Sequence, residues 1–199
     1  MFRFFSLLSL LIYGTCLAGS VQAFEIDPLT REPLVKREEM RRTPEDPAMM
    51  GGGMSFKSWS KSPGQYAPGT IVISTRERSL YLVQDGGRAL RYGIGVGRTG
   101  FTWGGKVKVT AKREWPDWTP PAAMRKRQPG IPSHMKGGIN NPLGARALYL
   151  GSTIYRIHGS NEPHTIGTAV SSGCFRMTNP DVIDLYKRVP VGAPVIVLR

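Results

Sequence analysis

Residues 70–83 read TIVISTRERSLYLV, and this stretch decides the fold class. Apolar runs at 70–74 and 79–83 flank the polar residues 75–78, a pattern that predicts two strands joined as a hairpin. Many short strands with little helix are typical of a mainly β domain, either a β-sandwich or a barrel-like sheet. Further strands are expected at 89–96, 106–113, 147–150, 153–157 and 195–198, where apolar residues alternate with polar ones or run together.

Helix is expected near the C-terminus, within a chain predicted to hold one or two short helices. Asn179 is expected to cap this helix, with Pro180 in its first turn. Val182, Leu185 and Val189 then recur at helical spacing, which predicts one buried face. Upstream, the Pro- and Trp-rich residues 114–142 are expected to be irregular.

Composition narrows the class of protein. The chain has 199 residues, of which 40% are hydrophobic and 21% are charged. These values exclude a collagen, a long coiled coil and a wholly disordered chain. The formal net charge of +13 predicts an anionic partner, which leaves nucleic acid, an anionic membrane surface or a polyanionic cell-wall polymer.

The first 23 residues resemble an export signal. One charge at Arg3 precedes an apolar run at 4–13, and the small-residue pattern at 21–23 matches a cleavage site. A membrane-spanning helix would need roughly 20 apolar residues, so residues 1–23 are interpreted as a signal peptide. A periplasmic or cell-envelope location follows, with no integral membrane segment after cleavage and no nucleic acid as partner.

Residues 24–63 are expected to form a flexible, disordered linker. They hold 14 charged residues, seven of each sign, together with several prolines and a Gly-Gly-Gly run. Such a stretch buries too little apolar surface to offset the entropy of ordering it. Residues 64–199 are therefore predicted to be the folded domain, and they hold 19 basic and seven acidic residues.

Cleavage of the signal peptide would leave Cys174 as the one cysteine of the exported chain. An unpaired cysteine in an oxidising compartment forms an interchain disulfide, is kept for its reactivity, or is buried and inert. His158 ends a predicted strand, and Ser172-Gly173-Cys174 opens the segment after the following loop. A Cys–His pair supplies a nucleophile and its base, and backbone N–H groups around Gly173 can stabilise an oxyanion.

The sequence around these residues resembles a known family. Residues 157–163 (IHGSNEP), 165–167 (TIG) and 171–177 (SSGCFRM) resemble the H-G-T/S … S-x-G-C-x-R signature of the L,D-transpeptidases with a YkuD-type catalytic domain. Residues 141–144 (NPLG) resemble the family's entry to the site. The resemblance covers about residues 68–199, and it implies a β-sandwich catalytic domain that acts on peptidoglycan without a cofactor.

The resemblance also implies roles for individual residues. Cys174 would be the nucleophile and His158 the proton donor and acceptor. Some members carry a second histidine just before the Gly-Cys pair, where this chain has Ser172, so proton transfer falls to His158. The supporting residues implied are Gly159 or Ser160 to orient the histidine, Ser172 and Gly173 for the oxyanion, and Arg176 to support the site or bind a substrate carboxylate.

The reaction implied by the resemblance passes through a thioester. Cys174 would attack the third residue of a peptidoglycan tetrapeptide stem and release the terminal D-alanine, and carbapenems would acylate the same thiol. A second stem, an envelope protein or water would then accept the acyl group, so cross-linking, protein attachment and L,D-carboxypeptidase activity remain open. The alternative that is not an enzyme is a non-catalytic cell-wall-binding module.

Other features have plainer interpretations. His158, His164 and Cys174 are the right types for zinc but lack a fourth ligand, so no metal site is predicted. Trp115 and Trp118 are expected either to line a substrate groove or to pack in the core. The basic run at 125–127 contacts an anionic polymer or lies on a solvated loop.

Overall fold

The computed structural model describes residues 55–199. The predicted signal peptide and most of the predicted linker lie outside the described residues. Among residues 55–199, no helix has both the length and the apolar content needed to cross a bilayer.

Strands are the main regular structure of the described chain, which also has two α-helices, α1 (Ala122–Arg127) and α2 (Asn179–Arg188). Short 3-10 helices lie at Asp85–Gly87 and Pro163–Thr165. The strands are β1 (Ser58–Lys61), β2 (Ile71–Ser74), β3 (Ser79–Val83), β4 (Arg88–Gly93), β5 (Val96–Gly97), β6 (Gly105–Glu114), β7 (Arg146–Leu150), β8 (Arg156–His158), β9 (Ala169–Ser171), β10 (Phe175–Arg176) and β11 (Pro194–Leu198).

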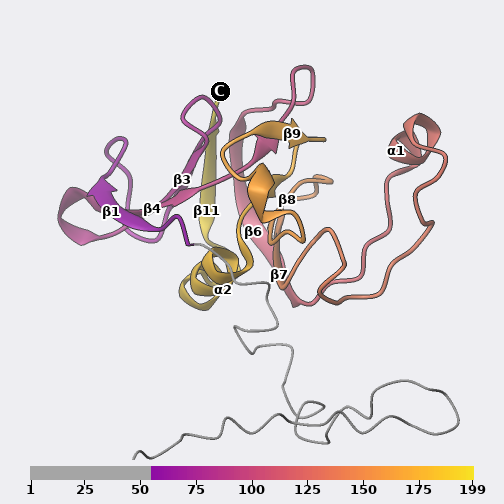
Figure 1. Ribbon diagram of the computed structural model, residues 1–199. Coiled ribbons are helices and arrows are strands. Elements are labelled where there is room, and N and C mark those ends of the chain that lie inside the picture. Colours follow the sequence, from indigo (N-terminus) through magenta and orange to yellow (C-terminus); the bar gives the residue numbers. More distant parts are fainter. Residues whose placement is uncertain (1–54) are drawn as a thin grey trace, which may run out of the picture. The chain divides into compact units, whose positions relative to one another are not determined.

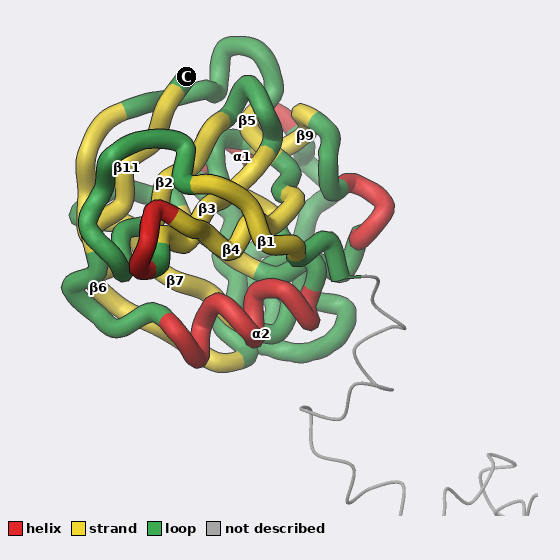
Figure 2. The backbone as a smooth tube through the Cα atoms, turned by 90° about the vertical axis from the view of Figure 1, so that its left-hand side faces the viewer, coloured by secondary structure: helices red, strands yellow, loops and turns green. Residues whose placement is uncertain are grey.

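Nine strands form one sheet in the order β1-β4-β3-β2-β11-β6-β7-β8-β10 (Figure 1), and β5 pairs with β9. The long strand β6 belongs to both halves of this sheet, because its first part pairs with β11 and its second part with β7. The register shifts between Val109 and Ala111, and such an irregularity bends a strand. The core contains residues from both halves and from α2, which lies beside β7 (Figure 2). The expected mainly β fold is confirmed. The two halves of the expected sandwich are parts of one continuous sheet.

The hairpin of β2 and β3 is buried on both faces, which explains its unbroken apolar runs. Ile71, Ile73 and Leu80 lie in the main core. Val72 and Tyr81 pack in a smaller cluster on the opposite side, with Ala89 of β4. Because alternate residues of a strand point to opposite faces, both sets must be apolar here.

Several element boundaries differ from the sequence prediction, and the strand expected at 89–96 is divided into β4 and β5. The strand expected at 153–157 is β8, which begins only at Arg156, because a turn occupies the residues after Gly151. The cap of α2 is Thr178, whose hydroxyl accepts a hydrogen bond from the Asp181 N–H at 3.3 Å. Asn179 was the wrong residue for the cap, since its side chain is used in a contact described below.

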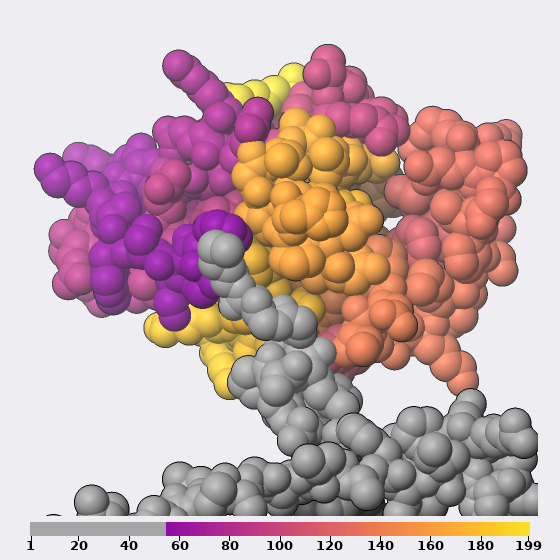
Figure 3. All heavy atoms as spheres, in the orientation of Figure 1, coloured from indigo at the N-terminus to yellow at the C-terminus, as the bar shows by residue number. Residues whose placement is uncertain are grey.

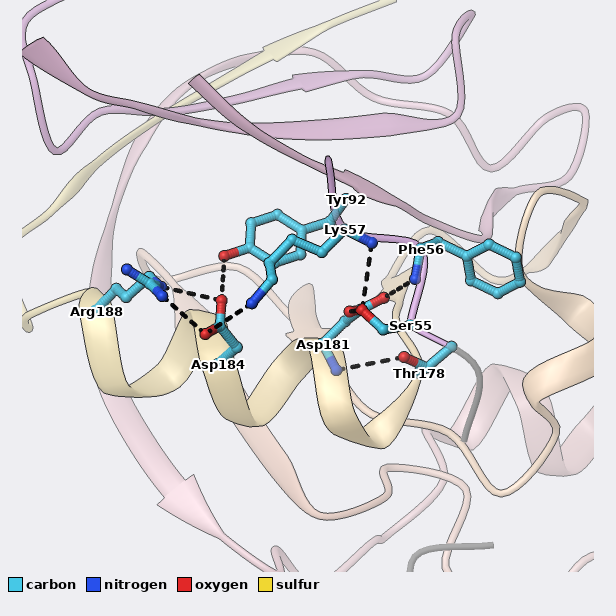
Figure 4. Close-up of polar contacts among 8 residues, drawn as sticks. All are labelled: Ser55, Phe56, Lys57, Tyr92, Thr178, Asp181, Asp184 and Arg188. Carbon is cyan, nitrogen blue, oxygen red and sulfur yellow. Dashed lines mark hydrogen bonds and ion pairs between the residues drawn. The ribbon is translucent and has the colours of Figure 1, made fainter. Parts of the chain in front are cut away.

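The predicted linker boundary at residue 63 is wrong. β1 lies inside the expected linker and pairs antiparallel with β4. Just before it, Asp181 of α2 accepts hydrogen bonds from the Ser55 hydroxyl and from the Phe56 N–H, and Lys57 pairs with Asp184 at 3.2 Å (Figure 4). These polar contacts order a segment that has too few apolar residues to be recognised as folded from composition.

We expect Asp181→Ala to lower the free energy of unfolding by about 2–3 kcal/mol, because it removes two hydrogen bonds to a buried carboxylate. Asp181 is only 1% exposed, so water cannot replace these partners. Denaturation in guanidinium chloride measures the change. Ser55→Ala, which removes one of the two bonds, should have the smaller effect, and equal midpoints for all three proteins would contradict the account.

Candidate active site

The pairing of β8 with β10 brings the predicted nucleophile and base to one face. The strands are parallel, with Phe175 opposite Ile157 and Arg176 opposite His158. Ile157 and Phe175 are at most 1% exposed and lie in the core. Because side chains alternate along a strand, His158 and Arg176 must occupy the other face. Cys174 directly precedes β10 and is two residues from Arg176, which places it on that face as well.

A cavity of about 590 Å³ opens on this face, and both Cys174 and His158 line it. The opposing wall comes from the irregular segment between β6 and β7, which includes Trp118, Met124 and Met135. Figure 3 shows this segment, coloured coral, beside the orange residues around 155–175, with a hollow between them. The site is therefore a groove between the end of the sheet and a long loop.

His158 is a neutral, oriented base. Its Nδ1 lies 2.5 Å from the Gly159 carbonyl oxygen, which can only accept, so Nδ1 carries the hydrogen and Nε2 has the free lone pair. The pKa of His158 is lowered to about 3, chiefly by burial; the Gly159 hydrogen bond opposes this shift, and the nearby Arg176 and Arg156 charges add to it. Gly159 thus orients the imidazole. Ser160 instead accepts a hydrogen bond from the Glu162 N–H at 3.0 Å.

The backbone around His158 is held by a close contact with α2. Asn179 Oδ1 accepts a hydrogen bond from the Ala145 N–H at 2.9 Å. A Cβ added to Gly159 or Gly144 would lie 2.2 or 2.3 Å from that oxygen, so neither position can carry a side chain. Gly144 also has a φ of +62°, which favours glycine. This junction explains why a glycine follows the histidine, and it gives Asn179 a role that sequence reasoning missed.

The loop that carries Cys174 is closed by Ser171. The Ser171 hydroxyl accepts from the Gly173 N–H at 3.1 Å and donates to the Cys174 carbonyl at 2.6 Å. The Gly173 N–H is therefore occupied within the loop. The N–H groups of Ser172 and Cys174 have no acceptor among residues 55–199, and they are the available oxyanion donors. Ser172 also lines the cavity.

Trp103, just before β6, and Tyr155, just before β8, support this loop. The Trp103 Nε1–H donates to the Gly173 carbonyl at 3.0 Å, and its ring stacks on Tyr155 at 4.8 Å between centroids. A Cβ on Gly173, whose φ is +106°, would lie 2.4 Å from the Tyr155 ring. Neither aromatic residue carries a motif signal. Only the tertiary structure brings Trp103 to a glycine seventy positions later.

Burial raises the pKa of the Cys174 thiol, while hydrogen bonds from Arg156 and the charges of Arg156 and Arg176 oppose this shift. The sulfur is thus mainly a thiol at neutral pH and needs a base to become a nucleophile. A neutral imidazole is a group that can accept such a proton, and His158 lines the same cavity.

Arg176 lines the cavity with its guanidinium tied to the neighbouring loop. Its Nη1 lies 2.8 Å from Glu162 Oε2 and 3.4 Å from the Thr165 hydroxyl. The resemblance implied that Arg176 either supports the site or binds a substrate carboxylate. The ion pair with Glu162 fits the first of these roles. His164 is exposed and does not line the cavity.

Of the other residues singled out in the sequence, some line the cavity and others do not. Trp118 lines the cavity, whereas Trp115 does not. Arg125, Lys126 and Arg127 form the exposed last turn of α1. Within residues 55–199, no group of three His, Cys, Asp or Glu side chains is arranged to hold a metal ion.

The lowered pKa of His158 predicts a loss of stability in mild acid. The folded imidazole titrates near 3, whereas an exposed one in the unfolded chain titrates near ~6.5. Between these values the unfolded state binds more protons. The free energy of unfolding therefore decreases as the pH is lowered, by up to ~1.4 kcal/mol per pH unit. Asp184, with its pKa lowered to about 2, contributes only below about pH 4.

Urea denaturation of the parent and of His158→Gln at about pH 7 and about pH 4.5 tests this contribution. The parent should lose more stability than the variant over that interval. Equal losses would show that His158 is not buried in its neutral form.

Comparison with known proteins agrees with this geometry. Residues 68–197 match the family model for the YkuD L,D-transpeptidase catalytic domain. The probable L,D-transpeptidase YbiS of Escherichia coli is 38% identical over 134 residues, which is 63% of this chain and 43% of that protein. This chain therefore matches less than half the length of that relative.

The fold is shared with a solved structure. An L,D-transpeptidase from Mycobacterium smegmatis superimposes with a TM-score of 0.50 at 22% identity, over 65% of this chain and 58% of its own. A chain from Brucella melitensis, named a probable carnitine operon oxidoreductase, is 48% identical over 71% of this chain and 92% of its own, with a TM-score of 0.48. From the family match over residues 68–197, this chain belongs to the YkuD family of L,D-transpeptidase catalytic domains.

Proposed function

We propose that the protein is an exported L,D-transpeptidase that joins peptidoglycan stem peptides through a thioester on Cys174. The observation that carries this proposal is that Cys174 and His158 line the same cavity, where the imidazole is neutral with Nδ1 bound to the Gly159 carbonyl and the thiol is protonated. Family membership supplies the reaction class.

The first half-reaction forms the acyl-enzyme. His158 Nε2 takes the proton from the Cys174 thiol, and the sulfur attacks the carbonyl carbon of the third residue of a tetrapeptide stem. The N–H groups of Ser172 and Cys174 stabilise the oxyanion. The C–N bond to the terminal D-alanine then breaks, and the departing amine takes the proton from His158.

The second half-reaction returns the enzyme to its starting state. The amine of a second stem attacks the thioester and gives its proton to His158. The C–S bond breaks, and the sulfur recovers that proton as a thiol. No cofactor takes part, because every bond change is an acyl transfer balanced by one proton.

The net positive charge of the residues that line the cavity supports an acidic substrate. Arg98, Arg156 and Arg176 line the cavity against the single carboxylate of Glu162. Stem peptides carry free carboxylates, which a net positive cavity attracts. The resemblance of residues 1–23 to an export signal supports delivery of the protein to the periplasm or cell envelope, where this polymer lies.

Incubation of the purified protein with disaccharide-tetrapeptides, followed by mass spectrometry of the products, tests the proposal. The expected product is a dimer that lacks one D-alanine. Tripeptides alone would indicate a carboxypeptidase, and a stem joined to an added envelope protein would indicate attachment activity. Folded protein with no product would favour a non-catalytic wall-binding module.

A further inference from the structure

Arg156 is a cavity residue that the Cys–His mechanism leaves without a role. It begins β8, two residues before His158, and therefore lies on the same face of the strand. The register of β8 with β10 sets Ile157 opposite Phe175, and continuing that register by one residue sets Arg156 opposite Cys174. Arg156 and Cys174 also line the same cavity.

The charge of Arg156 is not balanced by any carboxylate in the described part of the chain. Its Nη1 makes one long hydrogen bond, 3.4 Å, to the Ile154 carbonyl, and its guanidinium lies 5.0 Å from the centre of the Tyr149 ring. Its Nε is buried with no oxygen or nitrogen acceptor among residues 55–199, and the hydrogen bonds from Arg156 described above go to the Cys174 sulfur. Arg176, by contrast, is neutralised by Glu162 at 2.8 Å. A buried donor on an unpaired cation is costly unless an anion occupies the site in the working state.

We propose that Arg156 is a third residue of the active site, whose guanidinium stabilises the negative charge on the Cys174 sulfur. This inference rests on the proposed function only in taking Cys174 as the nucleophile. When the thiol proton moves to His158 Nε2, the sulfur becomes an anion in a poorly solvated cavity. Arg156 supplies the opposite charge across the strand pair.

The other charged and titratable groups around the sulfur do not replace Arg156. His158 is neutral before proton transfer, and the Glu162 carboxylate is held by Arg176. Arg98 reaches the cavity from beyond β5, with its guanidinium over the Phe101 ring at 4.5 Å. The loop between β6 and β7 lines the cavity with uncharged side chains only, among the described residues: Trp118, Pro121, Met124, Gln128, Pro132, Met135, Asn140, Pro142 and Leu143.

The test is the pH dependence of Cys174 alkylation by iodoacetamide, a neutral reagent that does not need the transpeptidase reaction. The full chain carries Cys16→Ser, so that Cys174 is its one thiol. We expect Arg156→Gln to displace the rate–pH curve toward higher pH and to lower the rate at about pH 7 by about tenfold, which corresponds to one unit of thiol pKa.

Two further variants separate charge from shape. Arg156→Lys keeps the charge and should retain most of the parent rate, whereas Arg156→Met keeps the length and should behave like Arg156→Gln. Arg125→Gln removes a cation from the exposed last turn of α1 and should leave the curve unchanged.

An overlap of the Arg156→Gln and parent curves would overturn the proposal, and so would a lysine variant as slow as the methionine variant. Near-UV circular dichroism identifies a variant that fails to fold, in which case the lysine and methionine variants decide. A displaced curve in a protein that fails to cross-link stems would uphold this inference and refute the proposed function.

Discussion

Cys174→Ala is expected to abolish acyl transfer, lowering kcat/KM for a tetrapeptide donor by about 10⁴-fold or more. The neighbouring serines should not replace the thiol, because a hydroxyl ionises far less readily than a thiol and the Ser171 hydroxyl donates to the Cys174 carbonyl. Alanine fits the space of the thiol, so the fold should persist. The loss would therefore be chemical and not structural.

Steady-state release of D-alanine measures the effect. Cys174→Ser is the matched control for shape: its hydroxyl occupies the place of the sulfur but does not ionise to a useful extent, so it should be nearly as inactive. Ser171→Ala tests the loop separately and should lower activity by a smaller factor. Substantial D-alanine release by Cys174→Ala would contradict the assignment of the nucleophile.

His158→Gln should give the second largest loss, about 10³-fold in kcat/KM at about pH 7. Burial keeps the Cys174 proton on sulfur, and glutamine cannot take it at the position of Nε2. Without the base, only the small thiolate fraction reacts. The rate of the variant should therefore rise by about tenfold per pH unit below the thiol pKa, whereas the parent rate stays nearly flat.

His164→Gln is the matched control, since His164 is an exposed histidine outside the cavity. Its activity should equal that of the parent at every pH. A flat pH profile for His158→Gln would show that His158 does not act as the base, whatever the size of the loss.

Much of the site could be predicted because its chemistry lies in one short stretch of sequence. His158 and Cys174 are sixteen residues apart, and the apolar residues between the polar ones mark the strands that carry them. The register of β8 and β10 then puts both residues on one face, since Ile157 and Phe175 fill the core. Alternation alone predicts this outcome once the strands are known to be neighbours.

The rest depends on contacts between distant segments. Trp103 reaches the Gly173 carbonyl, and Asn179 reaches the Ala145 N–H, but a single sequence carries no signal of either pairing. Ser171 lies within the quoted motif, but the sequence assigns it no role, because hydrogen bonding within a tight loop is not visible in residue order. Composition predicts a linker at Ser55 and the residues after it, because it carries no signal of the polar contacts with Asp181 that hold them.

The intact mass of the protein, taken shortly after mixing with a tetrapeptide donor and quenching in acid, tests the central claim most directly. The account predicts an added mass equal to the donor less one D-alanine, located on the peptide that contains Cys174 and absent from Cys174→Ala. Turnover of the donor with no adduct on that peptide, or with an adduct on another residue, would contradict it.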